Sequence, residues 1–129
     1  IQKYNLQENI IYTGRLNSDE MVEYLAKCNV YVMPSVMENH SSSLIEAMMV
    51  GTPSISALVG GTASLVKHGY NAMLYNSLDV RSLAGNIIRL LNDDGLAVKL
   101  SQNAIKIRHE RRDEFGAEMN IILKQLTRI

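Results

Sequence analysis

Strand-like and helical segments alternate along most of this chain, and the connections between them are short. Compact apolar runs are predicted as strands at residues 9–14, 29–34, 53–59 and 72–75. Segments with helical periodicity or helix-capping signals separate these runs. Such alternation is typical of a parallel sheet, whose neighbouring strands need helical crossovers. The sequence therefore predicts an α/β fold, with helices flanking a parallel sheet.

The first helix is predicted from a capping signal. Asn17 followed by Glu20 resembles a capping box, and Met21, Leu25 and Cys28 then mark one apolar face. Cys28 is the only cysteine, so no intrachain disulfide can form and a reducing cytoplasm is favoured. We predict that Cys28 is a small buried side chain.

A second helix is predicted over residues 42–50. It should stop at Gly51, because glycine ends helices readily and Pro53 follows two residues later. The next strand begins at Pro53 and alternates Ser54 and Ser56 with apolar residues. This alternation favours an edge strand, or a strand that lines a polar cleft.

The second half of the chain is mainly helical. A short helix is predicted at residues 62–68, and Asp79 is predicted to cap a longer one. Apolar residues recur in the longer helix every three or four positions: Val80, Leu83, Ala84, Ile87, Ile88 and Leu91. Two more helices are expected after the turn at 92–95, the last over residues 115–126. Charges of both signs in segment 106–115 predict a solvated helix face, with a polyanion patch or a membrane-surface role as alternatives.

Composition limits the classes of function. Thirteen Lys and Arg residues balance thirteen Asp and Glu residues, so no net field draws the whole chain to nucleic acid. With 129 residues and 47% hydrophobic content, the chain suits one globular domain. No apolar run approaches membrane-spanning length and no signal-peptide pattern opens the chain. Because it starts at Ile1, we expect a fragment of a longer protein.

The segment just before the second predicted helix carries most of the candidate chemistry. Glu38 and Glu46 bracket it. A helix that begins near Ser42 presents unpaired N–H groups and the positive end of its dipole, which suits a phosphate or diphosphate. The alternatives are a solvated loop glutamate at position 38, and a capping box in which Glu46 serves a backbone N–H beside Ser43.

Several motifs in this order carry a family resemblance. They are NIIYTGRL, NVYVMPS, Glu38, Glu46-Ala47-Met48, Gly51-Thr52-Pro53 and Gly60-Gly61. Between about Asn9 and Leu91 the chain resembles the nucleotide-sugar-binding domain of the family 4 (group 1) glycosyltransferases. The resemblance implies a GT-B architecture, in which two Rossmann-like domains face each other across a cleft. Residues 1–129 would then be a truncated, partial C-terminal domain, the one that binds the donor.

The same resemblance implies roles for individual residues. Glu38 would be the catalytic residue, accepting hydrogen bonds from hydroxyls of the transferred sugar, and Glu46 would bind the ribose hydroxyls of the nucleoside. The other implied donor-binding residues are His40, Ser41, Ser42, Ser43, Gly60 and Gly61. Their alternatives are an exposed loop histidine, helix-capping serines and a tight glycine turn. Ser64 departs from the family, which usually has a glutamate soon after the double glycine.

The implied reaction moves a sugar from a nucleotide diphosphate to an acceptor hydroxyl with retention at the anomeric carbon. It needs no cofactor and no metal, and the sequence lacks a clustered Asp, His or Cys set to hold one. The partners are a nucleotide-diphosphate sugar and the acceptor domain of the parent protein, in the cytoplasm or at the inner surface of its membrane. The alternative function is a non-catalytic Rossmann-like binding or assembly module.

Family members also begin this domain with two further strands, which carry a Gly-rich turn and basic residues that contact the diphosphate. By analogy, those strands lie between the predicted strands at 9–14 and 29–34. Without them, we expect the fragment to be catalytically inactive. We further expect it either to pair its first strand directly beside the second, or to cover an open sheet edge by self-association.

Overall fold

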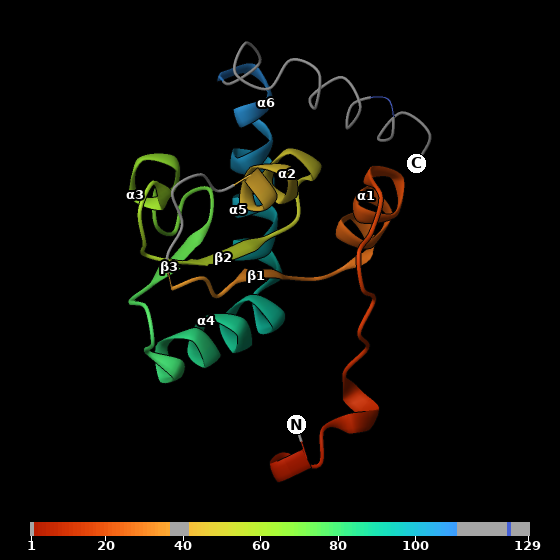
Figure 1. Ribbon diagram of the computed structural model, residues 1–129. Coiled ribbons are helices and arrows are strands. Elements are labelled where there is room, and N and C mark those ends of the chain that lie inside the picture. The colour runs from red at the N-terminus through yellow and green to blue at the C-terminus, as the bar shows by residue number, and fades with distance from the viewer. Residues whose placement is uncertain (1, 37–41, 111–123, 125–129) are drawn as a thin grey trace.

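Three short strands form a parallel sheet at the centre of the molecule (Figure 1). The computed structural model describes residues 2–36, 42–110 and 124. The strands are β1 (Tyr31–Met33), β2 (Ser54–Ala57) and β3 (Met73–Tyr75), in the order β1-β2-β3. Val32 lies opposite Ile55, and Ile55 lies opposite Met73. The predicted α/β class and the parallel sheet are confirmed.

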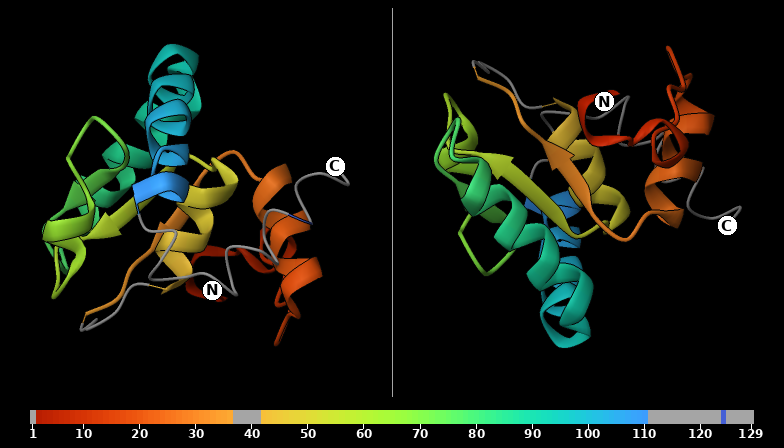
Figure 2. Two further views of the ribbon diagram at one scale, coloured as in Figure 1. Left: turned by 90° about the horizontal axis from the view of Figure 1, so that it is seen from above. Right: turned by 90° about the horizontal axis from the view of Figure 1, so that it is seen from below.

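Helices cover both faces of this sheet. They are α1 (Ser18–Lys27), α2 (Ser42–Val50), α3 (Thr62–Leu65), α4 (Val80–Asn92), α5 (Asp94–Ile105) and α6 (Ile107–Glu110), with 3-10 turns η1 (Gln2–Tyr4) and η2 (Gln7–Asn9) before them. Figure 1 shows α2 and α4 on opposite faces. Both views of Figure 2 place α1 and α3 on opposite sides of α2. Among the described residues, no helix is long and apolar enough to cross a membrane.

Two hydrophobic clusters, one on each face, hold these layers together. The first joins α2 to β1 and α6, and includes Met33, Leu44, Met48, Ala104 and Ile107. The second joins β2 and β3 to α4 and α5, and includes Ile55, Met73, Leu90 and Leu100. Helix α5 therefore contributes to both clusters, through Leu100 on one side and Ala104 on the other.

Helix α1 begins with the predicted capping box. The Asn17 side chain accepts the Glu20 N–H at 2.9 Å, and the Glu20 carboxylate accepts the Asn17 N–H at 2.9 Å. The buried side chains of α1 are Val22 and Leu25. The prediction of a buried Cys28 is wrong, because this residue is exposed. It caps the C-terminus with extended backbone, which takes its side chain off the inner face of the helix.

Helix α2 has the predicted bounds and ends in a Schellman motif. The Gly51 N–H donates to the Met48 carbonyl at 3.1 Å, and the Thr52 N–H donates to the Ala47 carbonyl at 3.0 Å. This geometry requires a left-handed residue, and Gly51 has a φ of 92°. The Arg108 side chain adds a hydrogen bond of 2.7 Å from Nε to the Met49 carbonyl. Both contacts fix the C-terminal end of α2.

The predicted strand at residues 9–14 is wrong. Asn9 ends η2, and residues 10–14 belong to no helix or strand. Ile11 and Tyr12 are 84% and 80% exposed. A strand needs a neighbouring strand with which its backbone exchanges hydrogen bonds. Among the described residues β1 pairs with β2 alone, so residues 9–14 have no such neighbour there. The expected pairing of this segment beside β1 is therefore also wrong, whereas self-association stays a prediction.

The serines of β2 do not mark an edge strand or a polar cleft. Strand β2 is the middle strand of the sheet, and all four of its residues are buried. Ser54 and Ser56 satisfy their hydroxyls locally, by donating to the carbonyls of Thr52 at 2.8 Å and Ala57 at 3.0 Å. A serine whose hydroxyl bonds to nearby backbone can replace an apolar residue in a buried strand.

Helix α4 buries a narrower stripe than its sequence predicts. Asp79 caps it as expected, by accepting the Ser82 N–H at 3.0 Å. The residues that pack on the second cluster are Leu83, Ile87 and Leu90, whereas Val80, Ala84, Ile88 and Leu91 are exposed. The sheet is narrow, so it covers only part of the apolar face. Helix α5 follows directly, with Asp93 as its cap, and the helix expected at 115–126 falls almost wholly outside the described residues.

Candidate functional site

The carboxyl ends of β1 and β2 lie at the same edge of the sheet, because the two strands are parallel neighbours. The connection after β1 leads into α2 at Ser42, and the connection after β2 contains Gly60 and Gly61. In open parallel sheets, ligands bind at this edge. The fold therefore places two segments that carry predicted donor-binding residues at the same edge of the sheet.

The first turn of α2 has one polar face. Ser42 and Glu46 are half-buried and lie four residues apart, so their side chains share a face of the helix. Ser43 is exposed beside them. The opposite face is buried, through Leu44, Ile45, Ala47, Met48 and Met49. The start of a helix offers N–H groups that suit an anion, and Glu46 lies one turn further along the same helix face.

Ser43 anchors α2 to the sheet instead of capping it. Helix α2 already begins at Ser42, so the alternative in which Ser43 and Glu46 form a capping box is wrong. The Ser43 hydroxyl lies 3.7 Å from Met33 Sδ, at the end of β1, within reach of a weak hydrogen bond. This contact ties the first turn of α2 to the strand that precedes it.

Three predicted site residues, Glu38, His40 and Ser41, lie outside the described residues. The assignments of these residues, with Glu38 as catalytic, therefore stay predictions. What the structure does describe is the part of the site that follows them, from Ser42 onward. Glu38 and Glu46 are predicted to lie on either side of an anion. Only Glu46 is within the described residues, on α2, so the position of Glu38 is predicted from the sequence alone.

The glycine pair forms an exposed turn between β2 and α3. Gly60 has a φ of 47°, which favours glycine, and both glycines are exposed. Thr62, the next residue, is fully buried and holds the turn through its hydroxyl. No role for Thr62 was predicted from the sequence. The sequence pattern that could have indicated its role is a threonine directly after two glycines. The same pattern is typical of an ordinary helix start.

Ser64 occupies the position at which the family resemblance led us to expect a glutamate. Its hydroxyl donates to the Gly61 carbonyl at 2.8 Å, and the residue is exposed. The side chain is thus bonded to the turn that begins its own short helix. This hydrogen bond helps to hold the backbone of Gly61 in place.

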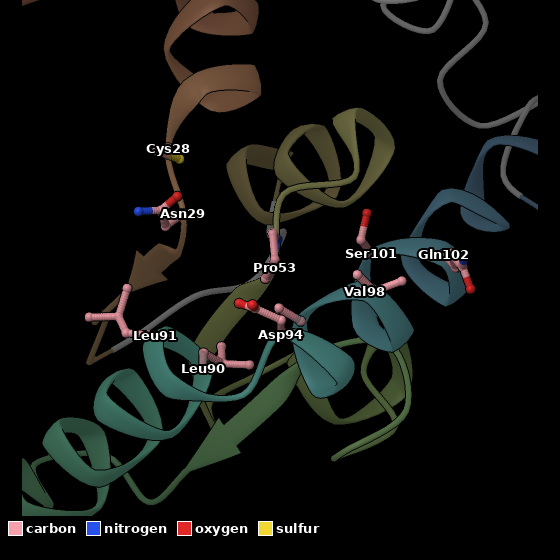
Figure 3. Close-up of a pocket in the computed structure, with 10 residues that line it drawn as sticks. Cys28, Asn29, Pro53, Leu90, Leu91, Asp94, Val98, Ser101 and Gln102 are labelled. Carbon is pink, nitrogen blue, oxygen red and sulfur yellow. The ribbon is translucent and has the colours of Figure 1, made fainter.

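A hollow of about 540 Å³ lies elsewhere, at the opposite edge of the sheet (Figure 3). Its lining includes Asn29 and Pro53, which precede β1 and β2, and so it faces the amino ends of these strands. Cys28 and Asn29 line one side, with Val98 and Ser101 of α5 on the other. Because it shares no residue with the predicted donor site, this hollow is a separate feature of the molecule.

We expect Cys28 to react slowly with alkylating agents. Partial burial of its sulfur raises the pKa of the thiol, although the residue as a whole is exposed. A raised pKa lowers the thiolate fraction near neutral pH, and the thiolate is the nucleophile. The rate of iodoacetamide labelling, followed by mass spectrometry against pH, should give a midpoint above that of the same chain in urea. A midpoint at or below the unfolded value would contradict this expectation.

Ionisable side chains do not gather into a metal site in the part of the chain that the structure describes. There, no group of three His, Cys, Asp or Glu residues lies close enough together to hold a metal ion. Among the described residues, the polar groups at the edge formed by α2 and the glycine turn are serine hydroxyls, the Glu46 carboxylate and backbone N–H groups.

Comparison with known proteins identifies the family. The pattern of the family described as "Glycosyl transferases group 1" matches residues 1–107. This chain belongs to the group 1 glycosyltransferases. Among curated relatives of this glycosyltransferase chain, 2-deoxystreptamine N-acetyl-D-glucosaminyltransferase from Niallia circulans is 34% identical over 100 residues, which cover 78% of the chain and 26% of that protein. D-inositol 3-phosphate glycosyltransferase from Acidothermus cellulolyticus is 32% identical over 96 residues, which cover 74% of this chain and 21% of that protein.

Solved structures give the same picture of the fold. Sucrose-phosphate synthase from Thermosynechococcus elongatus aligns with a TM-score of 0.79 and 32% identity, over 98% of this chain and 31% of that one. HepE from Anabaena, solved in complex with UDP-glucose, aligns with a TM-score of 0.82 and 24% identity, over 98% and 33%. These comparisons confirm the predicted resemblance to the C-terminal domain of GT-B enzymes. The group 1 glycosyltransferase chain spans between about a fifth and a third of the lengths of these relatives.

Proposed function

We propose that this chain is the donor-binding portion of a retaining glycosyltransferase, which transfers a sugar from a nucleotide diphosphate to an acceptor hydroxyl. The observation that carries the proposal is the edge where the polar first turn of α2 and the exposed Gly60-Gly61 turn follow adjacent parallel strands. In a group 1 glycosyltransferase, that edge is suited to a phosphorylated sugar donor.

The chemistry that this edge offers is positioning and electrostatic stabilisation. When the glycosidic bond breaks, its electron pair passes to the leaving diphosphate, whose negative charge grows. The N–H groups and dipole at the start of α2 stabilise that charge. The Glu46 carboxylate can accept hydrogen bonds from both ribose hydroxyls. In the proposal, Glu38 accepts hydrogen bonds from the transferred sugar. The acceptor oxygen bonds to the anomeric carbon on the face that the diphosphate leaves, and the hydroxyl proton passes to an oxygen of the departing diphosphate.

The proposal assigns only part of the reaction to this chain. The chain spans a fifth to a third of its relatives, and an acceptor site needs a second wall. We therefore propose that the chain by itself binds a donor weakly and transfers no sugar. Its partner in catalysis would be the acceptor-binding domain of a parent protein, and no cofactor takes part.

Titration with UDP-glucose tests donor binding, with GDP- and ADP-sugars in parallel because the base is not specified. In nitrogen-15 NMR spectra, the amides of Ser42, Glu46, Gly60 and Gly61 should shift on addition of a donor. Glu46→Gln should weaken binding by about 10-fold or more, since a hydrogen bond to a charged group contributes about 1.5–3 kcal/mol. Glu23→Gln is the matched control, because Glu23 is an exposed helical glutamate that pairs with Lys27 on α1.

Three outcomes bear on this proposal. Shifts confined to the α2 edge and the glycine turn, lost in the Glu46 variant alone, would support it. No shift with any nucleotide sugar, while the spectrum remains that of a folded protein, would overturn it in favour of the non-catalytic module. Sugar transfer by this chain alone, at the rate of a full-length relative, would contradict the expectation that it is inactive.

A further inference from the structure

Thr62 is a buried polar residue in the connection between β2 and α3. It follows the exposed glycine pair directly, yet it is 0% exposed. Its Oγ1 accepts the Val59 N–H at 3.0 Å and lies 3.0 Å from the Ala57 carbonyl oxygen and 2.8 Å from that of Val59. The hydroxyl proton can serve one of these two carbonyls at a time. One side chain thus closes the whole connection from the end of β2 to the start of α3.

Those hydrogen bonds fix the backbone that carries Gly60 and Gly61. Glycine has more conformational freedom than any other residue, so two in succession make a turn that is loose unless something holds it. Gly61 caps α3 without a side-chain hydrogen bond of its own. The hydroxyl of Thr62 supplies what the glycines lack, because it joins positions 57, 59 and 62 across them.

We propose that Thr62 is a positioning residue for donor binding. It touches no ligand and acts through Gly60 and Gly61, whose exposed backbone it holds at the carboxyl edge of β2, on the side where α2 begins. The ligand class is a nucleotide-diphosphate sugar, whose diphosphate or sugar oxygens meet backbone groups of this turn. This inference rests on the proposed function.

The chain contains a matched control for this residue. Thr52 is also buried, at 3% exposed, and its hydroxyl also donates to a backbone carbonyl, that of Leu25, at 2.6 Å. It precedes β2, whereas Thr62 follows it, so the two threonines lie toward opposite ends of one strand. Thr52 therefore shares the burial and bonding of Thr62 and differs in its distance from the donor edge.

The experiment compares Thr62→Val, Thr62→Ser and Thr52→Val with the wild-type chain. Valine keeps the shape of threonine and removes the hydroxyl, whereas serine keeps the hydroxyl. We expect Thr62→Val to raise the Kd for UDP-glucose about 10-fold and to lower the nitrogen-15 NMR order parameters of Gly60 and Gly61. Thr62→Ser should keep the Kd within about twofold of wild type, and Thr52→Val should lower the melting temperature without changing the Kd.

The outcomes separate this inference from the proposed function. Unchanged order parameters at Gly60 and Gly61 in Thr62→Val would overturn the inference, and this measurement needs no donor. An equal loss of affinity in both valine variants would also overturn it, because general destabilisation would then be the cause. If Thr62→Val fails to fold, a Thr62→Ser variant that folds but loses affinity overturns it. A wild-type chain that binds no nucleotide sugar overturns the proposed function, and the donor role of Thr62 with it.

Discussion

Truncation of Leu100 to alanine is expected to lower the free energy of unfolding by about 2–5 kcal/mol. Leu100 is 0% exposed and packs in the second hydrophobic cluster, with Ile55 of the middle strand and Leu90 of α4. Removing its outer carbons loses their transfer free energy and leaves a cavity that packed neighbours fill only in part. Urea denaturation followed by circular dichroism would measure the change from the transition midpoint at an unchanged slope.

Val98→Ala is the matched control for that substitution. Val98 lies on the same helix, two residues earlier, and is 53% exposed. Surface substitutions of this kind usually change stability by less than about 0.5 kcal/mol. If Leu100→Ala proved as stable as Val98→Ala, the second cluster would not be the core of the domain, and the packing of α5 on the sheet would have to be reconsidered.

Gly51→Ala is expected to cost about 2 kcal/mol of stability. Its φ of 92° lies in the left-handed region, which costs an L-residue about 1–2 kcal/mol. An added Cβ would also lie 2.9 Å from Ile105 Cδ1 and 3.1 Å from Ser101 Oγ. The end of the isoleucine side chain can shift, so most of the effect should come from the backbone. Thermal denaturation of the variant beside wild type would measure it.

The control for Gly51 is a glycine with no such constraint. Gly85 lies inside α4, and a Cβ there would meet nothing within 4 Å. Alanine at this position should raise stability by up to about 1 kcal/mol, because it favours the helix more than glycine does. If Gly51→Ala raised the stability as Gly85→Ala is expected to do, the backbone conformation at Gly51 would not limit the fold.

The features that the sequence predicted well depend on neighbours within a few residues. The capping box of Asn17 and Glu20 and the end of α2 at Gly51 are set by hydrogen bonds that span three to five positions. Turn and cap residues identify such contacts directly. The parallel sheet followed from the order of these elements, because helical crossovers allow few other arrangements.

The wrong predictions concern residues whose state depends on distant parts of the chain. The segment at 9–14 has the composition of a strand, but pairing needs a neighbour that composition does not supply. Ser54 and Ser56 suggested exposure, whereas backbone carbonyls satisfy their hydroxyls in the core. Of the predicted site, Ser42, Glu46 and the two glycines lie at one edge of the sheet.

The C-terminal end of α2 contacts two later helices. At its C-terminus, Gly51 lies against Ile105 of α5, and Arg108 of α6 donates to the Met49 carbonyl. The nine residues of α2 extend about 14 Å, so contacts with α5 and α6 at one end help to set where the N–H groups at the other end lie. A substitution in those two helices that shifts the C-terminal end of α2 would also move its first turn, where we propose that the donor binds. Helices α5 and α6 carry none of the predicted site residues, yet they contribute to the position of that turn.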